Sequence, residues 1–116
     1  MCNKTLISLF VLIASAAPAG AHAFLDHAEP RVGNTVKTSP AAVTLWFTQR
    51  LEPAFSNAQV TDGSGATVST GRASVSGTVM RVGVRRLPPG TYRVHWKVLS
   101  VDTHTTEGNF TFRVGQ

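Results

Sequence analysis

An aspartate and a histidine stand two positions apart near the end of the chain, at Asp102 and His104. They lie in the polar stretch of residues 100–108, which follows a strand-like run over residues 91–99. In an extended chain, residues i and i+2 point to the same side, so both side chains can present donor atoms to one object. The pair predicts half of a metal site, whose other ligands must come from elsewhere in the chain.

Residues 1–21 have the pattern of a secretory signal peptide. A short polar start precedes an apolar run over residues 6–17, which is shorter than the roughly 20 residues that span a bilayer. The ending Ala-Gly-Ala suits signal peptidase, so we predict cleavage after Ala21, with His22 as the first residue of the exported chain. The alternatives are cleavage after Ala23, which would remove the histidine, and retention of the segment as an anchor.

A histidine at the N-terminus offers two nitrogen ligands, its α-amine and its Nδ1. An α-amine has an ordinary pKa of about 7.7 to 8.0, so a strongly binding metal can displace its proton near neutral pH. His22, Asp102 and His104 would together supply three nitrogens and one oxygen. Such a sulfur-free set in a tetragonal arrangement suits Cu(II), although nickel could share that geometry and zinc could bind tetrahedrally.

Export would leave residues 22–116 as one domain without cysteine, because Cys2 lies in the signal peptide. This domain could use neither a disulfide nor a thiolate ligand. The whole chain has a formal net charge of +5, but export argues against nucleic acid as a partner. No second apolar segment follows, so we expect the exported domain to be soluble. We also predict a monomer. The basic residues alternate with apolar ones, as on a solvated strand face: Arg81, Arg85, Arg86, Arg93 and Lys97.

Period-two alternation of apolar and polar residues, broken by Gly, Pro, Asn and Asp, predicts an all-β fold. About seven short strands in about 100 residues fit a β-sandwich. The expected strands cover residues 22–28, 42–48, 56–61, 78–84, 91–99 and 109–114, with weaker candidates at 66–69 and 72–75.

Tyr92 follows a tight Pro-Pro-Gly turn and starts a strand, as does the tyrosine of immunoglobulin-like sandwiches that hydrogen-bonds back to its turn. We expect two neighbouring strands of one sheet to face a second sheet. The inward-facing residues would be Tyr92, Val94, Trp96 and Val98 on the first strand, Phe110, Phe112 and Val114 on its neighbour, and Val43, Leu45 and Phe47 on the facing sheet.

Two other histidines and one methionine have a structural interpretation. His95 lies on the strand face opposite Tyr92, so we expect it to be solvated or hydrogen-bonded. Met80 has strand spacing and is interpreted as a packing residue. His27 shares the parity of Leu25 in the first strand, and an approach of His27 to the metal stays open.

The mature chain resembles the CopC-type periplasmic copper-binding, or copper resistance, proteins over essentially its whole length. The specific part is an N-terminal histidine combined with Ser-x-Asp-x-His at residues 100–104. The resemblance implies an immunoglobulin-like Greek-key β-sandwich or barrel that binds Cu(II) through His22, Asp102 and His104. The matching segments are residues 22–25, 29–30, 45–48, 90–96, 98–104 and 108–112.

The chain departs from the CopC pattern in two places. Gln49 stands where some members carry a glutamate beside the copper, so a carboxylate ligand from that loop is not expected. Other members have a methionine-rich segment for Cu(I), whereas only Met80 remains after export, and one thioether cannot build such a site. We therefore expect one Cu(II) per chain and no Cu(I) site.

The leading prediction is a non-enzymatic periplasmic carrier or buffer for Cu(II), serving copper tolerance or supply. An inner-membrane copper transporter is the partner that the resemblance implies. One alternative is a copper-dependent oxidative enzyme with an N-terminal histidine site. The anionic oxygen of Asp102 argues against it, because it stabilises Cu(II) and discourages redox cycling. A metal-free interaction module is the other alternative, since fold does not fix function.

Overall fold

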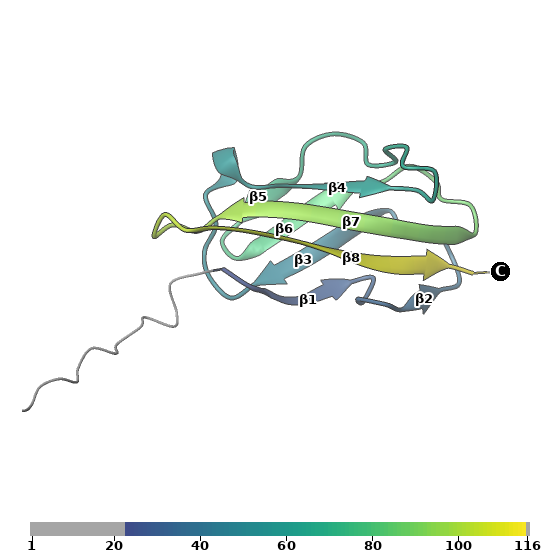
Figure 1. Ribbon diagram of the computed structural model, residues 1–116, viewed down its shortest axis with the longest axis horizontal. Helices are drawn as coiled ribbons and strands as arrows, with labels where there is room; N and C mark the ends of the chain where they lie inside the picture. The colour runs from purple at the N-terminus through teal and green to yellow at the C-terminus, as the bar shows by residue number, and fades with distance from the viewer. Residues whose placement is uncertain (1–22, 116) are drawn as a thin grey trace, which may run out of the picture.

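Two four-stranded β-sheets make up the part of the chain that the structure describes, residues 23–115 of this computed structural model (Figure 1). The predicted cleavage after Ala21 and the predicted ligand His22 lie outside these residues. The elements in chain order are β1 (Leu25–Glu29), β2 (Thr35–Val36), β3 (Ala42–Phe47), the 3-10 turn η3 (Pro53–Phe55), β4 (Asn57–Thr61), β5 (Ser74–Ser76), β6 (Val79–Gly83), β7 (Gly90–Leu99) and β8 (Thr105–Val114).

One sheet has the strand order β1-β3-β6-β5 and is antiparallel throughout. The other has the order β2-β8-β7-β4, in which β2 runs parallel to its neighbour β8. The predicted all-β sandwich is confirmed, with the two-residue β2 as a strand that the alternation did not indicate. Residues 66–69 were expected as a strand but make only isolated bridges, through Thr67 and Ser69.

Alternating strand residues point inward and form one core between the sheets, as the period-two pattern predicts. The ring of Phe47 meets that of Trp96 edge-on across this core, with centroids 5.1 Å apart. The prediction that Met80 packs in the core is confirmed, because its side chain is fully buried. Other fully buried residues are Val43, Leu45 and Val82 from one sheet and Val94, Val98 and Phe112 from the other.

Tyr92 closes the turn that precedes β7. Its hydroxyl donates a hydrogen bond to the carbonyl of Pro88 at 2.5 Å, and its ring stacks on Phe112 at 5.7 Å. The predicted bond from Tyr92 back to its turn is therefore confirmed. It fixes the start of β7 against the core.

Strand β8 begins at Thr105, four positions earlier than the expected start at Asn109. It pairs with β7 from Gly90↔Val114 to Leu99↔Thr105, so the long polar loop expected at residues 100–108 shrinks to a tight turn. Gly108 faces Trp96 on the neighbouring strand β7. A Cβ at position 108 would lie 2.6 Å from Trp96 Cζ2, so the indole ring needs a glycine there.

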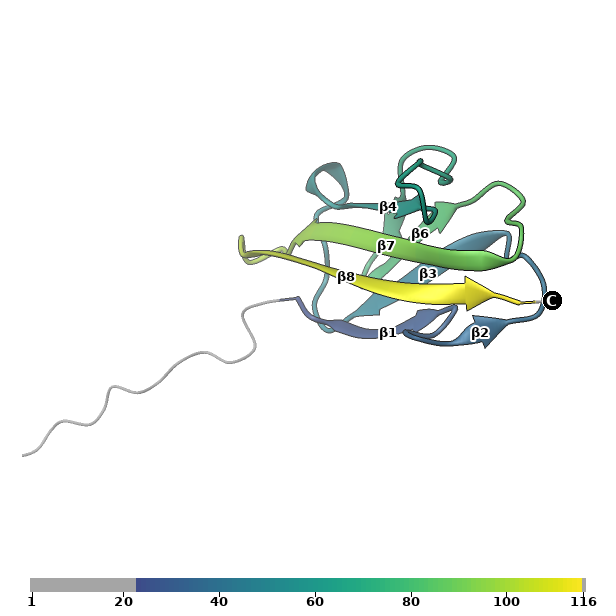
Figure 2. The same cartoon turned by 45° about the vertical axis from the view of Figure 1, so that its right-hand side comes forward.

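The turn between β7 and β8 lies at the same end of the sandwich as the start of β1. Both views show this arrangement, with β2 and the end of β8 at the opposite end (Figures 1 and 2). The loop after β3 runs along the same turn, because Leu51 bridges Ser100 and the amide of Val101 donates to the carbonyl of Arg50 at 3.0 Å. Three distant segments of the chain therefore meet at this end.

Candidate metal centre

Asp102 and His104 belong to the tight turn at residues 100–104. Two backbone hydrogen bonds close it, from the Ser100 amide to the His104 carbonyl at 2.9 Å and from the Thr103 amide to the Ser100 carbonyl at 2.8 Å. Thr103 has a φ of 73°, in the left-handed region. The expectation of an extended chain at these positions is wrong, because the hairpin reverses direction here.

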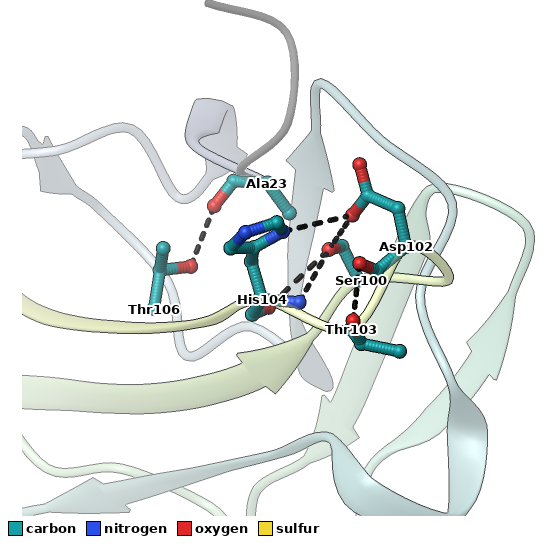
Figure 3. Close-up of polar contacts among 6 residues, drawn as sticks. All are labelled: Ala23, Ser100, Asp102, Thr103, His104 and Thr106. Carbon is teal, nitrogen blue, oxygen red and sulfur yellow. Dashed lines mark hydrogen bonds and ion pairs between the residues drawn. The ribbon is translucent and has the colours of Figure 1, made fainter. Parts of the chain in front are cut away.

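The turn nevertheless brings the two predicted donors together. The carboxylate Oδ1 of Asp102 lies 3.6 Å from Nδ1 of His104, and the two side chains are 45% and 46% exposed. In Figure 3 the imidazole lies between the carboxylate and the pair formed by Ala23 and Thr106. Both donors are therefore accessible to an ion from solvent at the end of the sandwich.

Ser100 supports both donors from inside the protein. Its side chain is fully buried. Its hydroxyl donates to the carboxylate of Asp102, and its oxygen accepts the backbone amide of His104 at 3.3 Å. This one hydroxyl therefore orients the carboxylate and ties it to the backbone of the second donor.

The same contacts lower the pKa of Asp102 below its ordinary value. The hydrogen bond from Ser100 is the main cause, and the neighbouring His104 adds a smaller effect in the same direction against a desolvation effect that raises it. Hydrogen bonds to the charged form of a carboxylate favour that form. Asp102 is therefore ionised near neutral pH and can offer an anionic oxygen.

The first described residue is held beside this turn. Ala23 is fully buried, and its carbonyl accepts a hydrogen bond from the Thr106 hydroxyl at 2.6 Å. Phe24 donates its amide to the Thr48 hydroxyl at 2.9 Å. The ligand role of His22, which directly precedes Ala23 in the chain, stays a prediction.

The other histidines lie on outer faces of the sheets. The ring of His27 stacks on Trp46 at 4.3 Å and its Nδ1 lies 2.7 Å from Asp26. His95 Nε2 lies 2.9 Å from Glu107 on the outer face of β7 and β8, so its prediction as a hydrogen-bonded residue is confirmed. Within residues 23–115, no three His, Cys, Asp or Glu side chains gather as a metal site would require.

Sequence reasoning missed the supporting hydroxyls of Ser100 and Thr106. The sequence signal for Ser100 is its place in the Ser-x-Asp-x-His block, two positions before Asp102. Thr106 has the same parity as Phe110 and Phe112, so it points toward the interior of the sandwich. That parity was not visible while β8 was expected to start at Asn109.

Comparison with known proteins places this fold and turn in one family. A family model described as the CopC domain matches residues 25–115. Protein YobA of Escherichia coli K12 is 37% identical over 98 residues, covering 81% of this chain and 79% of that protein. Copper resistance protein C of Xanthomonas campestris pv. juglandis is 31% identical over 126 residues, covering 95% and 92%.

A solved structure agrees with these sequence relatives. The crystal structure of CopC from Methylosinus trichosporium OB3b superposes with a TM-score of 0.77 at 33% identity, covering 81% of this chain and 94% of that one. The match of the family model over almost all described residues, together with these relatives, settles the family. This chain belongs to the CopC family.

Proposed function

We propose that the exported protein binds one Cu(II) ion per chain and acts as a carrier or buffer of copper in the periplasm. The ligands would be the α-amine and imidazole of His22, the carboxylate of Asp102 and the imidazole of His104. One observation carries the proposal. Asp102 and His104 lie together at the end of the sandwich where Ala23, the residue after His22, is hydrogen-bonded to Thr106. Membership of the CopC family and the name of its copper resistance relative support it.

The chemistry of the donor set favours Cu(II) over Cu(I). Imidazole, amine and an ionised carboxylate suit Cu(II), whereas thiolates and thioethers suit Cu(I). Met80 is fully buried between the sheets, so its sulfur is closed off from solvent. The carboxylate of Asp102 would also oppose reduction of the ion, in keeping with a carrier rather than an oxidative enzyme.

Cleavage after Ala21 is the processing that this function needs. Ala23 supports it, because its side chain is part of the hydrophobic core and its carbonyl is hydrogen-bonded. A start at Phe24 would remove this residue from the folded domain and would delete His22. The N-terminal mass of the exported protein tests the proposed cleavage directly.

The cellular setting follows from the same proposal. A signal peptide would send the domain to the periplasm as a monomer, where an inner-membrane copper transporter could exchange copper with it. Among residues 23–115, the structure contains no helix that is long and apolar enough to cross a membrane. Cross-linking of the copper-loaded protein in periplasmic and membrane fractions would test the transporter partner.

Titration of the protein that begins at His22 with Cu(II), followed by electron paramagnetic resonance, tests the binding itself. We expect one equivalent with a nitrogen-rich tetragonal signal. His104→Ala should weaken binding more than about 100-fold, because loss of a ligand exceeds the 10- to 100-fold effect typical of supporting residues. His95→Ala, which removes an imidazole from the outer sheet face, is the matched control and should bind like the wild type. Absence of a stoichiometric signal in the wild type would sink the proposal.

A further inference from the structure

A hydrogen bond between the Thr106 side chain and the Ala23 backbone joins the two sheets of the sandwich. Thr106 is on β8, in the sheet β2-β8-β7-β4, and its hydroxyl donates to the Ala23 carbonyl at 2.6 Å across 83 positions of sequence (Figure 3). Ala23 itself directly leads into the edge strand β1 of the other sheet. The bond therefore ties the beginning of one sheet to the second strand of the other.

A second pair of bonds holds the next residue to its own sheet. The Phe24 amide donates to the Thr48 hydroxyl at 2.9 Å, and the Thr48 amide donates to the Phe24 carbonyl at 2.9 Å. These bonds extend the β1–β3 ladder beyond the pair Leu25↔Phe47. The backbone is consequently anchored in both sheets within two residues of the predicted N-terminus.

Thr106 also belongs to the element that carries the candidate ligands. It stands two positions after His104, which corresponds to roughly 7 Å along a strand. The Cα atom of residue 22 can lie no farther than about 3.8 Å from that of Ala23, because one trans peptide bond joins them. A hydroxyl on the ligand-bearing hairpin therefore holds Ala23, the residue that follows His22 in the chain, beside this hairpin.

We propose that Thr106 is a positioning residue for copper binding, because its hydroxyl holds the Ala23 carbonyl and so presents the preceding residue to His104 and Asp102. This inference rests on the proposed function. Preorganisation of this kind raises affinity by removing the entropy loss of ordering a free chain end when the ligand binds. Without the bond, the amine and imidazole of His22 would have to be ordered at the moment of binding.

A purely structural role makes a different prediction. The bond between Thr106 and Ala23 would then contribute to the stability of the sandwich and leave copper affinity unchanged. Thr106→Val removes the hydroxyl while keeping a β-branched side chain of similar size. Thr106→Ser keeps the hydroxyl and should restore binding. Thr111→Val is the matched control, because Thr111 is a half-buried threonine of the same strand at the far end from the turn.

The experiment measures Cu(II) affinity by competition with a chelator, using each variant with His22 as the first residue. We expect Thr106→Val to bind about three- to tenfold more weakly, the range that corresponds to one net hydrogen bond. Thr106→Ser and Thr111→Val should stay within about twofold of the wild type. In the copper-free protein, nuclear magnetic resonance relaxation should show greater mobility of the Ala23 and Phe24 amides in Thr106→Val than in Thr111→Val.

A double-mutant cycle tests whether Thr106 affects copper affinity through the position of the His22 amine. One extra residue before His22 moves the amine away from the site, so Thr106→Val should cause little further loss of affinity in that background. Equal affinity of Thr106→Val and wild type would overturn the inference and leave the proposed copper site standing. Failure of the wild type to bind Cu(II) would overturn the proposed function, and the inference would fall with it.

Discussion

The hydroxyl of Ser100 acts on two candidate ligands at once. It donates to the carboxylate of Asp102 and accepts the amide of His104, from a position that solvent does not reach. Water cannot easily replace this buried hydroxyl, so its removal should leave the Asp102 carboxylate without that stabilising hydrogen bond. At the residue scale, this contact lowers the pKa of Asp102 and so extends the pH range over which its carboxylate stays charged.

Ser100→Ala is expected to raise the pKa of Asp102 toward its ordinary value, because the main cause of its lowering is removed. The carbon chemical shift of the Asp102 carboxylate, followed against pH in the copper-free protein, measures this change. A folded-state pKa below the unfolded value adds stability above the ordinary pKa of about 3.9, and this stability is lost as pH falls through the lowered value. Ser100→Ala should therefore reduce the loss of stability on acidification.

Ser64→Ala is the control for this titration. The Ser64 hydroxyl donates to Asp62 at 2.7 Å in a loop far from the site in sequence, and this bond is the main cause of the lowered pKa of Asp62. The variant should raise the pKa of Asp62 and leave that of Asp102 unchanged. An Asp102 titration that is the same in Ser100→Ala and wild type would contradict the role given to Ser100.

The β7–β8 hairpin is the element that shapes the candidate metal centre. Its ladder runs to Leu99↔Thr105, and in the turn that joins the two strands the carboxylate of Asp102 lies 3.6 Å from the imidazole of His104. The packing of Trp96 against Gly108 helps to keep the two strands in register near this turn. The position of the donors is therefore a property of the hairpin as well as of the Asp-x-His spacing.

Gly108→Ala is expected to destabilise the protein by about 1 to 3 kcal/mol, because the added Cβ would lie 2.6 Å from Trp96 Cζ2 and the ring must shift. Urea denaturation followed by Trp fluorescence measures the free energy of unfolding. Gly63→Ala is the control, since a Cβ there meets no atom within 4 Å, and it should change stability by less than about 0.5 kcal/mol. Equal stability of the two variants would show that the hairpin tolerates a side chain beside Trp96.

At the scale of the whole molecule, the segment at residues 22–23 has two roles, because Ala23 belongs to the hydrophobic core and His22 is a proposed ligand. The core includes Ala23, which neighbours the predicted cleavage point in sequence. The predicted proteolytic processing would therefore have to leave this residue in place for the hydrogen bond between Thr106 and Ala23 to form. Folding and the proposed copper binding would consequently place the same demand on where the predicted signal peptide is cut.

A protein that begins at Phe24 should lose both tight Cu(II) binding and stability, compared with one that begins at His22. The loss of the buried methyl group of Ala23 and of the Thr106 bond should lower the free energy of unfolding by about 1 to 2 kcal/mol. Thermal unfolding of both copper-free proteins, with Cu(II) titration in parallel, measures the two effects. Acetylation of the His22 amine is the control, because it should weaken copper binding and leave stability unchanged.

Local sequence pattern determined most of the strands, their inward faces and the kinds of donor atom. The alternation in residues 91–99 was enough to place Val94 and Val98 in the core, because side chains of a strand alternate whatever lies elsewhere in the chain. The turn sequence before Tyr92, compared with that of immunoglobulin-like sandwiches, was enough to predict a hydrogen bond from Tyr92 back to its turn, and the structure shows that the Pro88 carbonyl accepts it. Such features depend on residues within a few positions of one another.

Tertiary structure alone decided which distant residues meet at the candidate metal centre. The start of β8, the need for glycine opposite Trp96 and the bond from Thr106 to Ala23 all depend on contacts between segments far apart in the chain. Periodicity carries no information about such contacts, because they arise only when two sheets pack face to face. The spacing Asp-x-His identified two donors, and the packing of the sandwich decided that Ala23, the first described residue, lies beside the turn that carries them.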